Sequence, residues 1–287
     1  MKFAAYIQAT KDDFCLFEVC HRLFIEGMSD FFFCIPDEYW SGRITPPEDI
    51  NQVVAIAKRL ADMGANTHVK TFGVFKHRQP GRILVEVETQ VRNDSLKWIR
   101  ESGFEHIVIV DGDELWKKNY FHNMKKFIAE IKPEALALGM IPTIGLPGYP
   151  IEGAEDLATV YVGPGINFEC CRGPATEKFI QLRDVRAIIH FTATRRTMQE
   201  IIDKHRASGH YDDPSYDFEG WIANTLPKAC PGMVNAHMYR PHQIWKSVRD
   251  WTPYELDQIP LSIHPYLGIP KDYVINTWRP NADAACC

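Results

Sequence analysis

The sequence predicts an α/β fold, with a Rossmann-like, mostly parallel sheet flanked by helices and an irregular C-terminal portion. Through the first half of the 287-residue chain, apolar strand-like runs alternate with segments of helical periodicity, the order expected of a parallel sheet with helices on both faces. The runs 31–35 and 106–110 are almost entirely apolar, as in strands that are covered on both faces. We therefore expect one main domain over residues 1–210 and an extension over 211–287 that packs on it.

The expected elements can be placed in order along the chain. A β-rich run at 3–9 is followed by residues 10–13, which can cap a helix whose apolar face includes Phe14 and Leu16. After the strand 31–35, residues 46–49 open a second helix that stops before Gly64, a residue suited to a helix C-cap. Further strands are expected at 68–75, 106–110, 135–141 and 187–191, and further helices at 91–102, 120–131 and 197–207. The Gly- and Pro-rich segment 144–162 is expected to be a loop that can cover a site.

Composition excludes several classes of protein. The chain has 32 basic and 37 acidic residues, a net charge of −5, and it lacks the basic stripe of a nucleic-acid-binding protein, so no nucleic-acid partner is expected. No apolar run reaches about 18 residues, so no transmembrane segment is expected, and the first apolar run is too short for a signal peptide. Eight cysteines without a C-x-x-C pair fit reduced thiols. These features predict a cytoplasmic protein.

The most informative segment is Asp111-Gly112-Asp113-Glu114, where the apolar run 106–110 ends abruptly in three carboxylates. Such a cluster is costly beside a buried strand unless positive charge neutralises it. Asp111 and Asp113 share a face of an extended segment, and Gly112 permits a tight bend. Carboxylate oxygens suit Mn²⁺ or Mg²⁺, and a metal held in this way bridges a diphosphate and stabilises it as a leaving group.

Two blocks of sequence resemble the nucleotide-sugar glycosyltransferases of the A-type fold, and among them the family-2-type members. In that family an Arg-Asn pair precedes a helix that leads into the strand carrying a D-x-D motif, and here Arg92 and Asn93 stand before the strand that ends in Asp111-Gly112-Asp113. The second block, Ile189-His190-Phe191 followed by Arg195, Glu200, Lys204 and Gly209-His210, resembles the family's late strand with a histidine and an aromatic residue, and the helix after it. The resemblance covers roughly residues 1 to 210, and the segment from 211 onward matches nothing known to us.

The resemblance implies a metal-dependent glycosyltransferase, with 1–210 as the nucleotide-sugar-binding catalytic domain. Its donor would be a nucleotide-diphosphate sugar, a UDP- or GDP-sugar, and its acceptor a glycan or another hydroxyl compound. Asp111 and Asp113 would approach the metal, ribose and diphosphate on either side of Gly112, and Arg92 would lie near the nucleotide. A guanidinium also suits phosphate or ribose oxygens on chemical grounds, the alternative for Arg92 being a surface salt bridge. His190, or alternatively His210, would complete the metal site; a strand-end histidine bonded to the backbone is the other interpretation of His190.

Thr10 and Asp37 are candidates for nucleotide binding by position. Each follows a predicted strand, as Asp111 does, and the carboxyl ends of parallel strands meet at one edge of a sheet, where ligands bind. The first strand lacks the Pro-x-x-Asn style of ending that is frequent in the family. Base recognition by Thr10 and Asp37 is therefore inferred from their place in the fold alone.

The acceptor must also lose a proton. An inverting transferase uses a carboxylate for this step, and Glu155 and Asp156, in an acidic loop with Glu152, are the first candidates. Glu169 and Asp217 are alternatives, and each of these carboxylates is also consistent with a solvated surface position. A retaining enzyme requires no such base, so the sequence leaves the stereochemistry open.

Three other functions share parts of this pattern. A nucleotidyltransferase acting on a sugar phosphate would favour a Gly-rich, basic loop after the first strand, which residues 10–13 do not form. A phosphatase with an aspartyl nucleophile carries its D-x-D after an early strand, whereas here the motif lies beyond residue 100. A non-catalytic nucleotide- or sugar-binding module is the third alternative, because aromatic residues near the C-terminus can stack on sugar rings. These aromatic residues are Trp221, Trp245, Trp251 and Tyr254.

Overall fold

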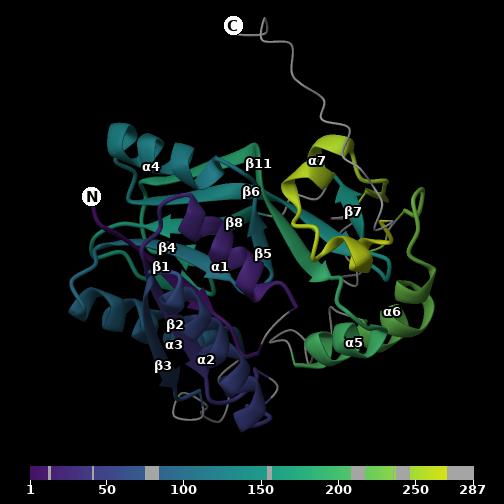
Figure 1. Ribbon diagram of the computed structural model, residues 1–287, viewed down its shortest axis with the longest axis horizontal. Coiled ribbons are helices and arrows are strands. Elements are labelled where there is room, and N and C mark those ends of the chain that lie inside the picture. The colour runs from purple at the N-terminus through teal and green to yellow at the C-terminus, as the bar shows by residue number, and fades with distance from the viewer. Residues whose placement is uncertain are drawn as a thin grey trace, which may run out of the picture.

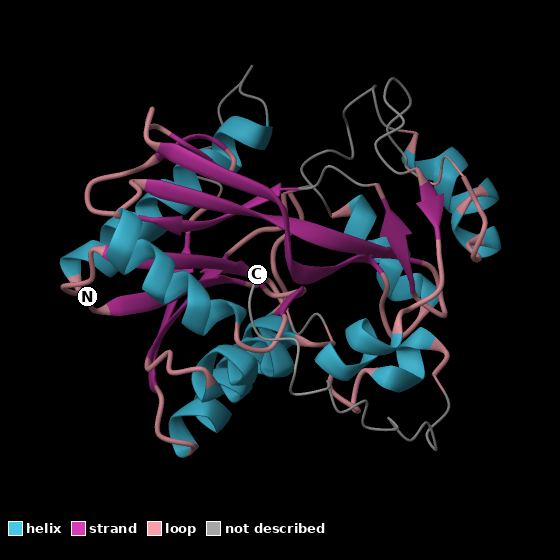
Figure 2. Cartoon of the chain, turned by 90° about the horizontal axis from the view of Figure 1, so that it is seen from above, coloured by secondary structure: helices cyan, strands magenta, loops and turns pink. Residues whose placement is uncertain are grey.

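The computed structural model describes residues 1–11, 14–40, 42–74, 84–153, 157–207, 217–234, 236 and 246–269. Its centre is a sheet with helices on both faces (Figures 1 and 2). The α/β class expected from the sequence is therefore confirmed.

Four strands form the parallel half of the sheet, in the order β3-β2-β1-β4. They are β1 (Phe3–Gln8), β2 (Asp30–Pro36), β3 (Asn66–Phe72) and β4 (His106–Asp111). In register, Gln8 at the end of β1 lies beside Cys34 on β2 and beside Asp111 on β4. Because these strands run in one direction, their carboxyl ends meet at one edge, and the D-x-D motif lies on that edge.

The other half of the sheet mixes strand directions. Strand β8 (Leu157–Val162) is antiparallel to both β4 and β6 (Ala135–Ile144), and β11 (Phe179–Ala193) is parallel to β6. Shorter strands extend it: β5 (Glu114–Trp116) on β11, β7 (Tyr149–Glu152) on β6 and β12 (Ser247–Val248) on β7, while β9 (Phe168–Cys170) and β10 (Gly173–Pro174) form a separate pair. The prediction of a loop over 144–162 is wrong, because β8 is buried from Ala158 to Val162 and its backbone is paired on both edges.

Alternate side chains of the buried strands face two separate layers of helices. Helices α1 (Leu16–Ile25), α2 (Pro47–Asp62) and α4 (Tyr120–Ile131) cover one face and pack with Ile7, Phe33 and Val110. Helix α3 (Leu84–Glu101) covers the other face and packs with Tyr6 and Phe32. This arrangement explains why β1, β2 and β4 are apolar at successive positions instead of alternating with polar residues.

Two helix starts differ from the prediction. Phe14 has a φ of +52°, in the left-handed region, so α1 begins at Leu16 with Cys15 as its N-cap. Helix α3 begins at Leu84 instead of 91, since Val87 and Val91 continue its buried face one turn apart. Arg92 therefore lies inside this helix and not ahead of it, in contrast to the arrangement that the resemblance implies.

The described C-terminal residues pack against both the sheet and the first helix. Helices α5 (Met198–Arg206) and α6 (Phe218–Asn224) build a third apolar cluster with Trp221 and Ile144, and the short turn η2 (Leu226–Lys228) follows α6. Helix α7 (Pro253–Gln258) and the turn η3 (His264–Leu267) join the main core, where the guanidinium of Arg22 on α1 donates to the backbone oxygen of Gln258 at 2.9 Å. The expected boundary at residue 210 lies outside the described residues.

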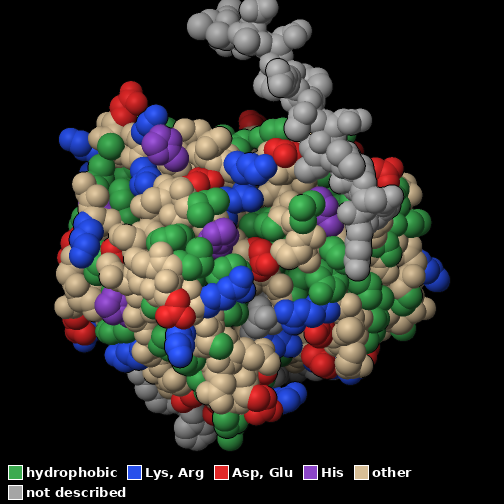
Figure 3. All heavy atoms as spheres, viewed as in Figure 1, with side chains coloured by type: hydrophobic (Ala, Val, Ile, Leu, Met, Phe, Trp, Pro, Cys, Tyr) green, Lys and Arg blue, Asp and Glu red, His purple; other side chains and the backbone are tan. Residues whose placement is uncertain are grey.

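No described helix is both long and apolar enough to cross a bilayer. Acidic and basic side chains are interspersed over the face shown in Figure 3, in keeping with the small net charge of −5.

Candidate functional site

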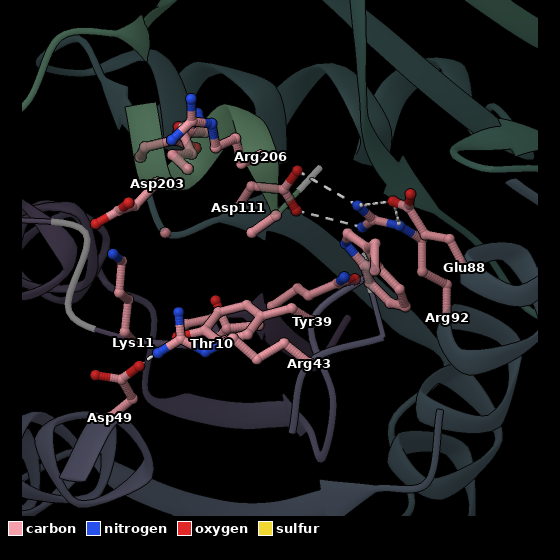
Figure 4. Close-up of a pocket in the computed structure, with 17 residues that line it drawn as sticks. Thr10, Lys11, Tyr39, Arg43, Asp49, Glu88, Arg92, Asp111, Asp203 and Arg206 are labelled. Carbon is pink, nitrogen blue, oxygen red and sulfur yellow. Dashed lines mark hydrogen bonds and ion pairs between the residues drawn. The ribbon is translucent and has the colours of Figure 1, made fainter. Parts of the chain in front are cut away.

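A cavity of about 600 Å³ lies at the carboxyl ends of β1 and β4. This is the edge at which α/β sheets bind ligands, and the volume is within the usual range of ligand pockets. Its wall combines the β1 end, the β2–α2 connection, α3, the D-x-D turn and α5 (Figure 4). The lining residues are Gln8, Ala9, Thr10, Lys11, Tyr39, Trp40, Arg43, Asp49, Glu88, Arg92, Asp111, Gly112, Asp113, Asp203, Lys204, Arg206 and Ala207.

Asp111, the last residue of β4, is paired with two arginines. Its Oδ1 lies 3.2 Å from Nη1 of Arg92, and its Oδ2 lies 3.0 Å from Nη1 of Arg172. Arg92 also pairs with Glu88, one helical turn away, at 2.8 Å (Figure 4). Burial alone raises the pKa of Asp111, but the two guanidinium charges outweigh it and hold the pKa below its ordinary value. Asp111 is therefore ionised at neutral pH.

Glu114 is part of the same network and is buried. Arg172, which reaches in from the turn after β9, pairs with Glu114 and also donates to the backbone oxygen of Thr159 at 2.8 Å. The other carboxylate oxygen of Glu114 accepts from the backbone N–H of Asp111 at 3.0 Å. Glu114 thus fixes the bend between β4 and β5 and does not line the cavity.

Asp113 faces a different set of nitrogen atoms. Its Oδ2 accepts from Nη2 of Arg195 at 2.9 Å and from the ammonium of Lys204 on α5, while Nε2 of His190 lies 3.6 Å away. Burial raises the pKa of Asp113, but the charge of Lys204, together with His190 and Arg195, holds that pKa well below its ordinary value. The motif therefore joins β4 to the segment that follows β11.

Gly112 lies in close contact with α1. A Cβ at this position would lie 3.3 Å from Cδ1 of Leu16 on α1 and 3.6 Å from Cβ of Ala9. The backbone N–H of Gly112 donates to the oxygen of Gln8 at 3.2 Å, which continues the β1–β4 pairing into the turn.

The expected Mn²⁺ or Mg²⁺ ion can be compared with this donor set. Three or more His, Cys, Asp or Glu side chains grouped to hold a metal are not found among the described residues. Asp113 and His190 are close enough to share an ion, but the carboxylate oxygen of Asp113 that faces His190 already accepts from Arg195 and Lys204. As paired here, the residues do not fit a divalent cation at Asp113, because the ion would have to displace Lys204.

The structure separates the two residues that were assigned by position. Thr10 lines the cavity. Asp37 does not, because its Oδ1 accepts from the backbone N–H of Val74 at 2.6 Å and its backbone oxygen accepts from Thr45. Asp37 therefore joins the chain after β2 to the chain after β3.

The candidate bases are placed only in part. Glu155, Asp156 and His210 lie outside the described residues. Asp217 caps α6 by accepting from the N–H of Gly220 at 3.1 Å, and neither Glu152 nor Glu169 lines the cavity. Asp203 on α5 does line it, and its Oδ1 accepts from Gln199 at 2.8 Å.

The aromatic residues near the C-terminus have structural contacts. Trp221 is buried and its ring N–H donates to Ala236, and the ring N–H of Trp251 donates to the backbone oxygen of Gly148. Tyr254 is exposed with Lys117 over its ring, and Trp245 lies outside the described residues.

Several residues of the site had no assigned role at the level of sequence. Glu88 forms an i, i+4 pair with Arg92, so the helical spacing could have indicated it. Tyr39, Trp40 and Arg172 come from segments without periodicity, and no sequence signal identifies them. Lys204 belongs to the block that resembles the family, but only the packing of α5 shows that it reaches Asp113.

Neither a protein-family model nor a curated protein sequence matches this chain. Among solved structures, the chain is similar to S. aureus TarS 1-349, with 15% identity and a TM-score of 0.42 over 67% of this chain and 61% of that one. The same fragment in complex with UDP-GlcNAc aligns at 14% identity with a TM-score of 0.42, over 71% of this chain and 64% of that one. The complex with UDP aligns at 19% identity with a TM-score of 0.34, over 50% and 36%. The chain thus spans less than two thirds of the TarS fragment, and its fold class rests on the sheet itself.

Proposed function

We propose that the chain is a glycosyltransferase that binds a nucleotide-diphosphate sugar in the cavity beside Asp111-Gly112-Asp113 and transfers the sugar to a hydroxyl acceptor. The observation that carries this proposal is the combination, in one cavity at the strand ends, of aromatic side chains, cations without an ion-pair partner among the described residues, and the D-x-D carboxylates. Each of these groups matches one part of such a donor.

The cations that follow β1 and β2 suit a nucleoside diphosphate. Lys11 and Arg43 both line the cavity, and neither has an ion-pair partner in the part of the chain that the structure describes. Arg43 lies over the ring of Tyr39, 5.8 Å from its centroid, on the wall opposite Asp111 and Asp203 (Figure 4). Aromatic rings such as Tyr39 and Trp40 stack on nucleobases, and the free cations attract phosphate.

The two ends of the D-x-D motif differ in local charge. Around Asp111, two arginines face three carboxylates, those of Asp111, Glu88 and Glu114, which leaves net negative charge that suits hydroxyl donors such as a ribose. Beside Asp113, the ammonium of Lys204 lines the cavity, and its positive charge suits a diphosphate. This order along the cavity supports ribose near Asp111 and phosphate near Asp113.

In the proposed reaction the acceptor oxygen forms a bond to the anomeric carbon of the sugar. The bond from that carbon to the diphosphate oxygen breaks, and its electron pair leaves with the nucleoside diphosphate. The acceptor proton passes to a carboxylate if the enzyme inverts configuration. Asp203 joins Glu155 and Asp156 as a candidate base, because it lines the cavity.

A thermal-shift screen of UDP-, GDP- and dTDP-sugars, each with EDTA and with Mn²⁺, tests the proposal. We expect one nucleotide class to raise the melting temperature in at least one of the two conditions. The Mn²⁺ or Mg²⁺ ion expected from the sequence stays a prediction, which the same two conditions address. If no nucleotide sugar stabilises the protein in either condition, the proposal is wrong.

A second experiment separates the proposed reaction from its alternatives. Release of nucleoside diphosphate from the stabilising donor identifies a transferase, which hydrolyses its donor slowly without acceptor. Release of nucleoside triphosphate when pyrophosphate is added identifies a nucleotidyltransferase, and binding without any release identifies a non-catalytic module. The variant Arg43→Gln should weaken donor binding by about tenfold, the effect of one charge-assisted hydrogen bond. Lys118→Gln is the matched control, because Lys118 pairs with Asp257 outside the cavity.

A further inference from the structure

The contacts of Lys204 set it apart from the other cations near the D-x-D motif. Its ammonium donates to Asp113 and, at 3.0 Å, to the backbone oxygen of Thr192. An ammonium has three N–H donors, and the third has no partner among the described residues. Lys204 also lines the cavity, with 27% of its side chain exposed. It therefore presents an unused donor and a positive charge to a ligand.

Arg195 has a different position although it pairs with the same carboxylate. Its side chain is 1% exposed, and its guanidinium donates to the backbone oxygens of Phe191 and Thr194 as well as to Asp113. Arg195 does not line the cavity. Arg195 thus approaches Asp113 from inside the protein, whereas Lys204 approaches it from the cavity.

Helix α5 holds Lys204 in this position. Thr197 caps the helix by accepting from the N–H of Glu200 at 3.1 Å. Ile201 and His205 are buried on the inner side of α5, and His205 packs against Trp221 with ring centroids 4.9 Å apart. A lysine between such anchors is placed by packing, so little conformational entropy is lost when it binds an anion.

Cations already occupy the place beside Asp113 that a divalent ion would take. The oxygen of Asp113 that such an ion would use already accepts from Arg195 and Lys204. The ammonium of Lys204 therefore supplies positive charge at this point of the cavity.

We propose that Lys204, held by Asp113 and α5, neutralises the diphosphate of the donor in place of a divalent cation. This inference rests on the proposed function and specifies how the leaving group is stabilised. As the bond from the anomeric carbon to the diphosphate oxygen breaks, the leaving diphosphate gains negative charge. The third N–H of Lys204 donates to that oxygen and stabilises the charge.

Calorimetric titration with UDP and with GDP tests the inference without relying on turnover. The unaltered protein should bind one of them with the same affinity in EDTA and in Mn²⁺. Lys204→Gln should weaken binding about tenfold or more in EDTA, Lys204→Arg should retain most of it, and Lys118→Gln should bind as the unaltered protein does. In Lys204→Gln, added Mn²⁺ should restore part of the affinity, because Asp113 has lost its ammonium partner.

A metal-binding measurement keeps the inference testable if Lys204→Gln folds poorly. Because a nucleoside diphosphate itself binds Mn²⁺, the electron paramagnetic resonance signal of free Mn²⁺ is compared with the diphosphate alone and with the diphosphate plus the unaltered protein, and the two signals should be equal. Further loss of the signal when the protein is added, or binding that requires Mn²⁺, or equal binding by Lys204→Gln and the unaltered protein, overturns the inference and leaves the proposed function standing. If neither diphosphate nor any nucleotide sugar binds in any condition, the proposed function itself fails.

Discussion

The two aspartates of the D-x-D motif are only two residues apart, yet they pair with different sets of cations. Asp111 pairs with Arg92 on α3 and with Arg172, which follows β9. Asp113 pairs with Arg195 and Lys204, which both follow β11. The two side chains that flank Gly112 therefore tie the end of β4 to α3 and the turn after β9 on the one hand, and to the segment after β11 on the other.

The cations that pair with the two aspartates also differ in their remaining contacts. The cations of Asp111 are each shared with a second carboxylate, Glu88 or Glu114, so each of these charges is divided between two carboxylates. Beside Asp113, the ammonium of Lys204 lines the cavity, and its third N–H has no partner among the described residues. The cations of Asp111 are thus held between carboxylates, whereas Lys204 keeps an unused donor at the cavity.

The largest expected effect is at Asp113. Asp113→Asn keeps the shape of the side chain but removes the negative charge that pairs with Arg195, which is 1% exposed. Breaking a buried pair in this way costs about 3–5 kcal/mol in the free energy of unfolding. Urea unfolding followed by circular dichroism measures it, and a loss below that of Arg92→Met would contradict the comparison.

A smaller effect is expected at Arg92. Arg92→Met keeps the buried stem and removes the charge, but Asp111 retains Arg172 and is itself 27% exposed. The expected loss is about 1–3 kcal/mol, the cost of leaving Glu88 and Asp111 less well paired. The same urea titration gives the value, and donor binding should change less than in Lys204→Gln.

The pH dependence of stability should distinguish the two sides as well. Folding lowers the pKa of both Asp111 and Asp113, and that of Asp113 more strongly. Their stabilising contribution is therefore complete above the unfolded value of about pH 4 and is lost as the pH falls through the lower folded values. The drop in unfolding free energy between pH 7 and pH 3 should be smaller in Asp113→Asn than in the unaltered protein. An equal drop would show that Asp113 does not contribute.

The smallest effect is expected at an exposed pair. Lys118 and Asp257 lie 3.0 Å apart, but their side chains are 47% and 46% exposed. Lys118→Gln should change the free energy of unfolding by about 0–1 kcal/mol, since exposed ion pairs are screened by water and salt. A loss comparable to that of Arg92→Met would mean that burial is not what distinguishes these pairs.

Much of the fold follows from local sequence patterns. The helix predicted at 120–131 is α4 with the same bounds, and the apolar runs at 3–9, 31–35 and 106–110 are β1, β2 and β4 to within a residue or two. The prediction for segment 144–162 was wrong because its Gly and Pro content indicated a loop. The only strand signal of β8 is a short apolar run, and in the sheet this strand lies between β4 and β6. Short runs of this kind are decided by the neighbours they pair with.

The sequence by itself determined that three carboxylates follow a buried strand at the ligand-binding edge of an α/β sheet, because apolar periodicity and an abrupt change to acidic residues are local properties. Only the tertiary structure decided which charges neutralise them. Arg172 reaches Asp111 across 61 positions of sequence and Lys204 reaches Asp113 across 91. Such pairings depend on strand order and on the packing of α5, and no short-range pattern encodes them.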